Sequence, residues 1–153
     1  MIEAVGKIII NRSPKSIIDF VSDIYSYKYA DLKINKVFSS YSIENNKYII
    51  SHNGYLRGIP GPTVSLEMTV DKDNLSVLYK DIPTFPSKYF LKFNGGFELA
   101  QVPNGTQVIH TERFNFKFPI KLIAEPFLKD WLQSDINKEM FRLKHLVEDN
   151  YSI

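Results

Sequence analysis

Hydrophobic and polar positions follow two different periods along this chain. From Phe127 to Glu148 apolar residues recur at spacings of three and four, which is typical of one face of an amphipathic α-helix. A helix of that length spans about 33 Å, enough to cross a small sheet. Before it, short apolar stretches and residues alternating with a period of two predict strands. The apolar face of the helix consists of Leu128, Leu132, Ile136, Met140, Leu143 and Val147.

The predicted strands form an antiparallel meander. The first strand, Val5–Asn11, leads into Ser13-Pro14, an N-cap followed by proline at the first helical position, and then into a short helix. Ile24–Leu32 follows as a second short helix or an irregular turn. A lone amphipathic helix must bury its apolar face, so we expect an α+β fold in which a curved sheet of about seven strands wraps around the C-terminal helix, as one domain over residues 1–153. The later strands are expected at Ile34–Ile43, Lys47–Leu56, Thr63–Val70, Leu75–Lys80, Tyr89–Val102 and Thr106–Phe118.

Three connections should share one end of this sheet, because strands that reverse direction place alternate connections at the same end. These connections are Arg57–Pro62, Asp81–Lys88 and Pro119–Pro126, and all three contain prolines and apolar residues, whereas the turns at the opposite end are polar. The asymmetry predicts an apolar portal at one end of the helix, with proline-stiffened ordinary loops as the alternative. The residues assigned to the portal are Ile59, Pro60, Phe85, Pro86 and Ile123.

Composition narrows the classes of function. Aromatic residues make up 14% of the chain, which suits an apolar pocket but equally a core filled by phenylalanine. The net charge of +2, with dispersed lysines, argues against nucleic acid as a partner. The chain has no cysteine, which excludes disulfides and thiol chemistry. No stretch resembles a signal peptide or a membrane span, so we expect a soluble, cytoplasmic protein and leave transient membrane contact open.

The last predicted strand carries residues that chemistry could use. Its alternation places His110 and Glu112 on the same face as Phe114 and Phe116, which would bury both polar residues in the concavity. Such a pair can act as general acid and base, orient a ligand, or form a polar pair inside the core, and all three interpretations stay open. The histidines and glutamate lack the spacing of metal ligands, so no metal is expected.

Four segments also carry motifs of a known type. Ile8–Ile17 resembles an opening strand followed by a proline-started helix, and Phe20–Tyr27 a "hydrophobic-x-Asp…Tyr/Trp" segment. Gly96–Val108 is similar to a late "W-x-L-x-P…G-T-x-V" hairpin, with Phe97 where Trp is common, and Leu143–Glu148 resembles a helix end. These motifs resemble the superfamily of START lipid-transfer domains, the birch pollen allergen and polyketide cyclase/dehydrase-like proteins (SRPBCC). The resemblance implies the helix-grip fold and a cavity for lipids, hormones, quinones or aromatic polyketides, and it implies no catalytic residues.

The leading hypothesis is a protein that binds or transports a hydrophobic or aromatic small molecule, such as a lipid, quinone or polyketide, between the sheet and the C-terminal helix. One alternative is a cyclase- or dehydratase-like enzyme that uses His110 and Glu112. Another is a partner-binding protein with a vestigial cavity. We favour binding over catalysis, without a cofactor, in a monomer or homodimer. The residues predicted to contact the ligand are Tyr48, Ile50, His52, Leu66, Met68, Tyr79, Phe93, Phe97, His110, Glu112, Phe114, Phe116 and Trp131.

Overall fold

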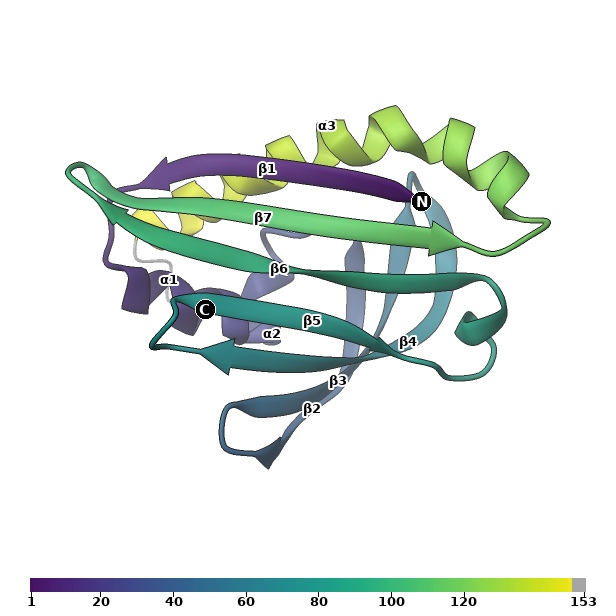
Figure 1. Ribbon diagram of the computed structural model, residues 1–153, viewed down its shortest axis with the longest axis horizontal. Coiled ribbons are helices and arrows are strands. Elements are labelled where there is room, and N and C mark those ends of the chain that lie inside the picture. Colours follow the sequence, from purple (N-terminus) through teal and green to yellow (C-terminus); the bar gives the residue numbers. More distant parts are fainter. Residues whose placement is uncertain (150–153) are drawn as a thin grey trace.

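The computed structural model of this chain describes residues 1–149, so the last four residues of the predicted 1–153 domain lie outside the described part. Within residues 1–149 there are seven strands and three α-helices, and Figure 1 shows the long C-terminal helix running along a curved sheet. Two short α-helices follow the first strand, as predicted. The elements in chain order are β1 (Ile2–Ile10), α1 (Pro14–Ser22), α2 (Ile24–Tyr27), β2 (Ile34–Glu44), β3 (Lys47–Leu56), β4 (Ile59–Asp71), β5 (Ser76–Ile82), the 3-10 helix η1 (Ser87–Tyr89), β6 (Leu91–Val102), β7 (Gly105–Phe116) and α3 (Lys121–Glu148).

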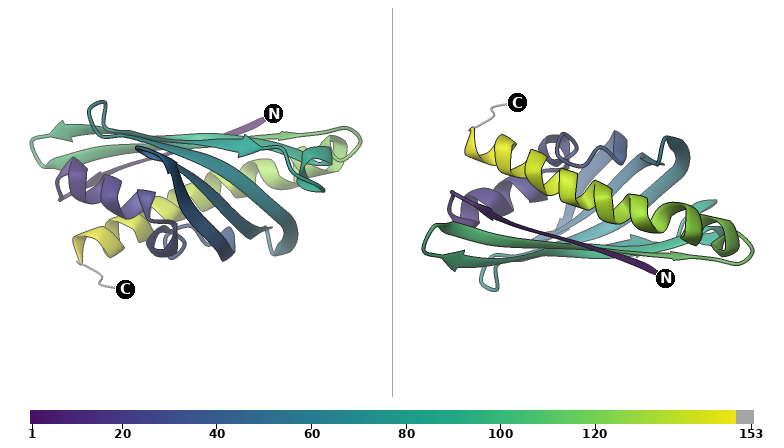
Figure 2. Two further views of the ribbon diagram at one scale, coloured as in Figure 1. Left: turned by 90° about the horizontal axis from the view of Figure 1, so that it is seen from below. Right: turned by 90° about the horizontal axis from the view of Figure 1, so that it is seen from above.

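All neighbouring strands in the sheet are antiparallel, and their spatial order is β1-β7-β6-β5-β4-β3-β2. The strands from β2 to β7 therefore form a meander, and β1 pairs with the last of them. Figure 2 shows β2, β3 and β4 bending away from the plane of the other strands, on the side where α3 lies. This arrangement confirms the predicted α+β class and the curved antiparallel sheet around the C-terminal helix.

The two short helices begin where the local sequence predicts. Ser13 Oγ accepts a hydrogen bond from the backbone N–H of Ser16 at 3.3 Å, and Pro14 takes the first helical position, where its missing N–H would have no partner. Asp23 ends α1 and caps α2, because its carboxylate accepts from the backbone N–H of Tyr25 at 3.2 Å. The segment predicted as a second short helix or an irregular turn, Ile24–Leu32, is thus a short helix over Ile24–Tyr27 followed by turns.

The strand β4 begins earlier than its alternation suggests. It starts at Ile59 rather than Thr63, because backbone pairing with β3 continues until Leu56 lies opposite Ile59. The tight turn between them consists of Arg57 and Gly58, which both have positive φ. The connection predicted as a loop is therefore mostly strand.

The helix α3 begins at Lys121 rather than at the predicted Phe127, and Pro126 lies inside it. A proline removes one backbone hydrogen bond, but the helix continues because its apolar face packs against β1 and β7. Gly6 of β1 permits this close packing, since a Cβ there would lie 2.6 Å from Cγ of Met140. No helix in the described part of the chain is both long and apolar enough to cross a membrane. The apolar residues of α3 that are buried are Ala124, Leu128, Leu132, Ile136, Met140, Leu143 and Val147.

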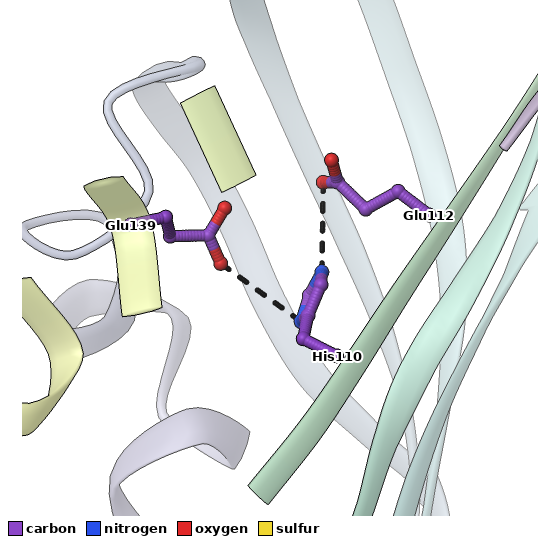
Figure 3. Close-up of side chains that lie close together, drawn as sticks. All are labelled: His110, Glu112 and Glu139. Atoms are coloured by element: carbon purple, nitrogen blue, oxygen red, sulfur yellow. Dashed lines mark ion pairs between the residues drawn. The ribbon is translucent and has the colours of Figure 1, made fainter. Parts of the chain in front are cut away.

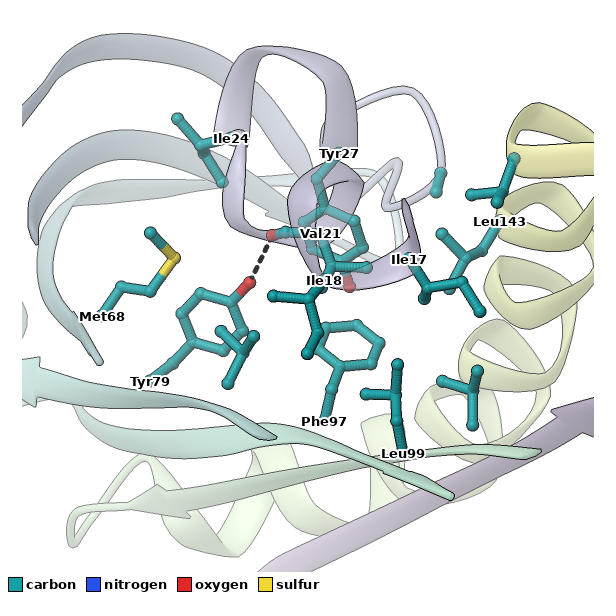
Figure 4. Packing of buried hydrophobic residues seen from close by; sticks show 14 of the residues in the cluster. Ile17, Ile18, Val21, Ile24, Tyr27, Met68, Tyr79, Phe97, Leu99 and Leu143 are labelled. Atoms are coloured by element: carbon teal, nitrogen blue, oxygen red, sulfur yellow. Dashed lines mark hydrogen bonds between the residues drawn. The ribbon is translucent and has the colours of Figure 1, made fainter. Parts of the chain in front are cut away.

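One half of the concave face is filled by α1. Ile17, Ile18 and Val21 of this helix pack in one buried cluster with Tyr79 and Phe97 of the sheet (Figure 4). The hydroxyl of Tyr79 donates a hydrogen bond to the carbonyl oxygen of Val21 at 2.8 Å. Most side chains that point inward from this part of the sheet therefore belong to a packed core, and Tyr79 lies at its border with the cavity in the other half of the concave face.

Candidate functional site

A cavity of about 200 Å³ lies in that second half of the concave face. Strands β3 to β7 form one wall, and α2 together with the segment leading into β2 forms the wall opposite. The predicted position between the sheet and the C-terminal helix is therefore wrong, because among the described residues α3 contributes only its N-cap residue, Ile120, to the wall. The residues that line the cavity are Ile24, Tyr27, Asp31, Lys33, Ile34, His52, Gly54, Tyr55, Leu56, Gly61, Pro62, Val64, Leu66, Tyr79, Asp81, Ser87, Phe90, Leu91, Phe93, His110, Glu112, Phe114, Phe116 and Ile120.

Most of the residues predicted to contact a ligand lie in this wall. The aromatic part includes Phe93 and Phe114, whose ring centroids are 5.0 Å apart, and Phe116 stacks on Phe114 at 6.4 Å. His52 lies on the β3 side, where burial lowers its pKa. The predicted contact residues that line the cavity are His52, Leu66, Tyr79, Phe93, His110, Glu112, Phe114 and Phe116.

Five predicted contact residues lie elsewhere. Ile50, Met68 and Phe97 face inward as expected, but they are buried in the cluster that α1 covers, and Tyr48 packs against the same cluster. Alternation along a strand gives the face of a side chain and not the element that covers it, which explains the difference. Trp131 borders a second pocket, of about 460 Å³, together with Leu32, Lys33, Tyr55, Gly58 and Asp135. Lys33 and Tyr55 line both this pocket and the cavity.

The three proline-containing connections lie at the same end of the molecule (Figure 2), and each contributes to the cavity wall, through Pro62, Ser87 and Ile120. Of the five residues assigned to the portal, Phe85 and Ile123 are the most exposed, at 80% and 77%. Ile59 and Pro60 are exposed, whereas Pro86 is partly buried. None of these five residues belongs to the cavity wall within the described chain, so the portal stays a prediction.

At its inner end the cavity meets a buried cluster of charged residues centred on Lys33. The Nζ atom of Lys33 lies 2.9 Å from a carboxylate oxygen of both Asp31 and Asp135. The same atom lies 2.9 Å from Glu139 Oε2 and 3.4 Å from Glu112 Oε1. These side chains are at most 13% exposed. The cluster joins the α2–β2 link, β7 and α3, and it was not predicted.

Burial and charge set the protonation of this cluster. Burial lowers the pKa of Lys33, but Asp31 and the other three carboxylates outweigh it and raise the pKa well above its usual value, so the ammonium stays charged. Burial raises the pKa of Asp31 in spite of Lys33 beside it. Burial and the charge of Glu139 also raise the pKa of Tyr27, and the protonated Tyr27 hydroxyl donates a hydrogen bond to Glu139.

His110 lies between two carboxylates, one at each ring nitrogen (Figure 3). Its Nε2 atom is 3.6 Å from Glu112 Oε1, and its Nδ1 atom is 3.8 Å from Glu139 Oε1. Burial lowers the pKa of His110, but Glu139 and Glu112 outweigh burial and raise it above the usual value. The arrangement therefore stabilises an imidazolium next to the cavity, held in place by the ring of Phe97 at a centroid distance of 4.0 Å.

Two sets of potential metal ligands occur among the described residues. They are His110 with Glu112 and Glu139, and Asp31 with Asp135 and Glu139, with ligand atoms within 4.8 Å of one another. In the first set the two carboxylates face different nitrogens of the imidazole, and in the second set the Lys33 ammonium already lies between the acids. Both arrangements suit a proton or an ammonium better than an ion that needs ligands converging on one point. The expectation of no metal stays a prediction.

One signal in the sequence could have revealed part of this cluster. Glu139 continues the three- and four-residue spacing of Leu132, Ile136 and Leu143, so a charged residue stands in the apolar face of α3, and it is fully buried. Asp135, one turn before Glu139 on the same helix, also pairs with Lys33. Nothing in the sequence marks Lys33 itself, because it comes near α3 only through the fold.

Comparisons with known proteins support the fold. No family model and no curated protein matches this chain. Among solved structures, a protein from Thermus thermophilus is 16% identical with a TM-score of 0.77 over 98% of this chain and 99% of that one. The aromatase/cyclase ZhuI from a Streptomyces species is 11% identical with a TM-score of 0.72 over 97% and 92% of the two chains.

A third similar structure is norcoclaurine synthase from Thalictrum flavum in complex with dopamine and hydroxybenzaldehyde. It is 10% identical to this chain with a TM-score of 0.66, over 99% of this chain and 88% of the other. These neighbours are helix-grip proteins of the SRPBCC superfamily. The chain therefore has the helix-grip fold, and the resemblance predicted from the sequence is confirmed at the level of the fold.

Proposed function

We propose that this protein binds a compact hydrophobic or aromatic small molecule in the cavity between the sheet and α2. The observation that carries the proposal is a mostly apolar cavity with one polar end, where Glu112 Oε2 is buried without a hydrogen-bond partner. A buried unpaired acceptor is costly, and a ligand that donates a hydrogen bond to it would relieve that cost. The enzymes among the structural neighbours, an aromatase/cyclase and a synthase, support an aromatic ligand.

The size of the cavity limits the ligand. Its volume of about 200 Å³ is below the range of about 300–1,000 Å³ usual for small-molecule sites. A molecule with about one or two rings suits it better than a full-length lipid, unless the portal end widens. The paired rings of Phe93 and Phe114 favour an aromatic group beside them.

A cyclase- or dehydratase-like reaction is a second candidate function, favoured by the His110 imidazolium at the cavity wall. This group could donate a proton to a ligand carbonyl or hydroxyl, with Glu112 and Glu139 stabilising the charge that His110 carries. Replacing His110 by Gln should then abolish turnover and leave ligand binding within about threefold, because the amide keeps much of the shape. Turnover that survives in His110→Gln would contradict this assignment.

We also propose that residues 1–153 act as one cytoplasmic domain, as a monomer or homodimer, and that ligands enter at the portal end. Phe85, Phe118 and Ile123 are exposed there at 80%, 78% and 77%, which is unusual for side chains of this size. Lys88, Lys117 and Lys121 are exposed beside them. Apolar tips flanked by lysines suit transient contact with an anionic membrane from which a hydrophobic ligand could be taken up.

The binding proposal is tested by thermal unfolding with a panel of aromatic and quinone-like compounds. A ligand that binds only the folded protein raises its Tm. Replacing Val64, which lies in the cavity wall, by Trp should fill the cavity and abolish the shift, while the matched change Leu78→Trp on the exposed outer face of β5 should preserve it. The absence of a shift with every compound, or an equal shift in Val64→Trp, would reject the cavity as the binding site.

A further inference from the structure

The polar groups at the cavity wall differ in how well the protein itself satisfies them. Among the described residues, Lys33 is the only lysine that lines the cavity. Its ammonium group already contacts four carboxylates at 2.9 to 3.4 Å. An anionic ligand would have to compete with those carboxylates for it. Lys33 therefore offers no free positive charge to a carboxylate or phosphate. The other basic group of the wall, His110, has a carboxylate at each ring nitrogen, Glu112 at 3.6 Å and Glu139 at 3.8 Å.

The acceptors of the wall are less well satisfied. Glu112 is 2% exposed, its Oε1 atom faces Lys33 and His110, and its Oε2 atom has no hydrogen-bond partner. Asp81 also lines the cavity, nearer the portal end. Burial raises the pKa of Asp81, and this effect outweighs the lowering by Lys92 and Lys117. Both residues line the cavity, and a carboxyl group can accept hydrogen bonds from a ligand that donates them.

The charge of the whole cluster points the same way. Asp31, Glu112, Asp135 and Glu139 are four carboxyl groups, whereas the basic groups beside them are Lys33, His110 and, at the outer edge, Arg142 at 4.0 Å from Asp135. The carboxyl groups outnumber the basic groups even when all three bases are protonated. A low-dielectric site of this composition favours the entry of positive charge.

The apolar part of the wall also suits a cation. The rings of Phe114 and Phe116 line the cavity from β7, the strand of His110 and Glu112, and the ring of Phe93 lines it from the neighbouring strand β6. Aromatic faces attract ammonium groups through their quadrupole, most strongly where water is excluded. An ammonium at Glu112 Oε2 would thus have a carboxylate beside it and aromatic rings around its hydrophobic stem.

We propose that the ligand of this cavity is a hydrophobic or aromatic amine whose ammonium group is bound by Glu112 Oε2. This inference rests on the proposed function, because it names the chemical class of the ligand for the same cavity. The ammonium donates a hydrogen bond to the unpaired oxygen, and its charge offsets the excess of carboxylates. Carboxylates, including fatty acids, and phosphorylated lipids are excluded as preferred ligands by the same charges.

Three probes that share one ring system distinguish the possibilities: naphthylethylamine, naphthylethanol and naphthylacetate, measured by isothermal titration calorimetry and thermal unfolding. We expect the amine to bind about tenfold or more tightly than the alcohol, because a hydrogen bond to a charged group is stronger than one between neutral groups. The acetate should bind most weakly. Acetate binding as tight as that of the amine would overturn the amine inference and leave the proposed function intact, whereas no binding by any probe would overturn both.

Substitution of Glu112 locates the interaction. Glu112→Gln removes the negative charge with almost no change of shape, so the amine should lose about tenfold in affinity and the alcohol less than about threefold. Glu98→Gln is the matched control, because it removes the same charge from an exposed position on the outer face of β6 and should change neither affinity. Equal amine affinity in Glu112→Gln and wild type would contradict the inference. If Glu112→Gln does not fold, the wild-type probe series decides: an amine that binds no more tightly than the alcohol would contradict the inference.

Discussion

Lys33 shows at the residue scale how a charge becomes stable inside this protein. Its long side chain leaves the α2–β2 link and reaches carboxylates of β7 and α3. Lysine brings three donors in a compact group, which matches acceptors that surround it from several directions. The cluster thereby connects three elements at the inner end of the cavity, where ordinary apolar packing would leave four acids unpaired.

Removal of this ammonium should destabilise the fold strongly. Lys33→Met leaves four buried carboxyl groups without their counter-ion, and breaking a buried pair in this way costs about 3–5 kcal/mol in the free energy of unfolding, measured in urea. Lys72→Met is the control, because Lys72 pairs with Asp19 at 3.3 Å where both side chains are about half exposed. That loss should be about 0–1 kcal/mol. Similar losses in the two variants would contradict a structural role for the cluster.

The raised pKa of His110 predicts a pH dependence of stability. Because the folded pKa lies above the unfolded value near 6.5, the folded state binds this proton more tightly, and the resulting stability is fully present below that value. It is lost as the pH rises through the folded pKa. His52 has a lowered pKa and acts in the opposite direction, so the comparison must be made with His110→Gln.

The unfolding free energy, measured from about pH 5.5 to 9, should therefore fall more steeply with pH in the wild type than in His110→Gln. Asp31 does not obscure the comparison, because it is present in both proteins. Parallel curves for the two proteins would show that His110 keeps an ordinary pKa in the folded state.

At the scale of elements, the periodicity of the chain correctly predicts that α3 and the strands exist, but it places their first and last residues less accurately. The apolar face of α3 is buried residue by residue as its three- and four-residue spacing indicates. The start of α3 was predicted too late because proline usually interrupts a helix, so Pro126 favoured a start after it. In the structure, packing on the sheet stabilises the helical turns before Pro126. The start of β4 was missed because pairing with β3 overrides the glycine and proline signals at Gly58, Pro60 and Gly61.

The β5–β6 connection should contact anionic membranes through Phe85, which is 80% exposed. Phe85→Ser should lower binding to vesicles of phosphatidylserine and phosphatidylcholine about fivefold in a sedimentation assay, because partial burial of one such side chain contributes about 1 kcal/mol. The matched change is Phe38→Ser on β2, also exposed and also beside a lysine, Lys36. Equal binding by wild type, Phe85→Ser and Phe38→Ser would exclude the portal end as a membrane contact.

At the scale of the whole molecule, the helix-grip fold divides the concave face into two halves with different roles. α1 fills one half with Ile17, Ile18 and Val21, and the other half keeps the cavity. The same strands supply core residues to one half and cavity residues to the other. The fold thus leaves a cavity beside the packed core.

The sequence by itself determined the helix, the strands, the α+β class and the inward faces that hold His110, Glu112 and the phenylalanines. These properties follow from periodicity, which is local along the chain. Only the tertiary structure decided that Phe97 and Met68 belong to the core rather than to the cavity, because α1 covers them. The tertiary structure also determined which residues form the charged cluster, because Lys33 and Glu139 are 106 positions apart and meet only when the sheet closes around α3.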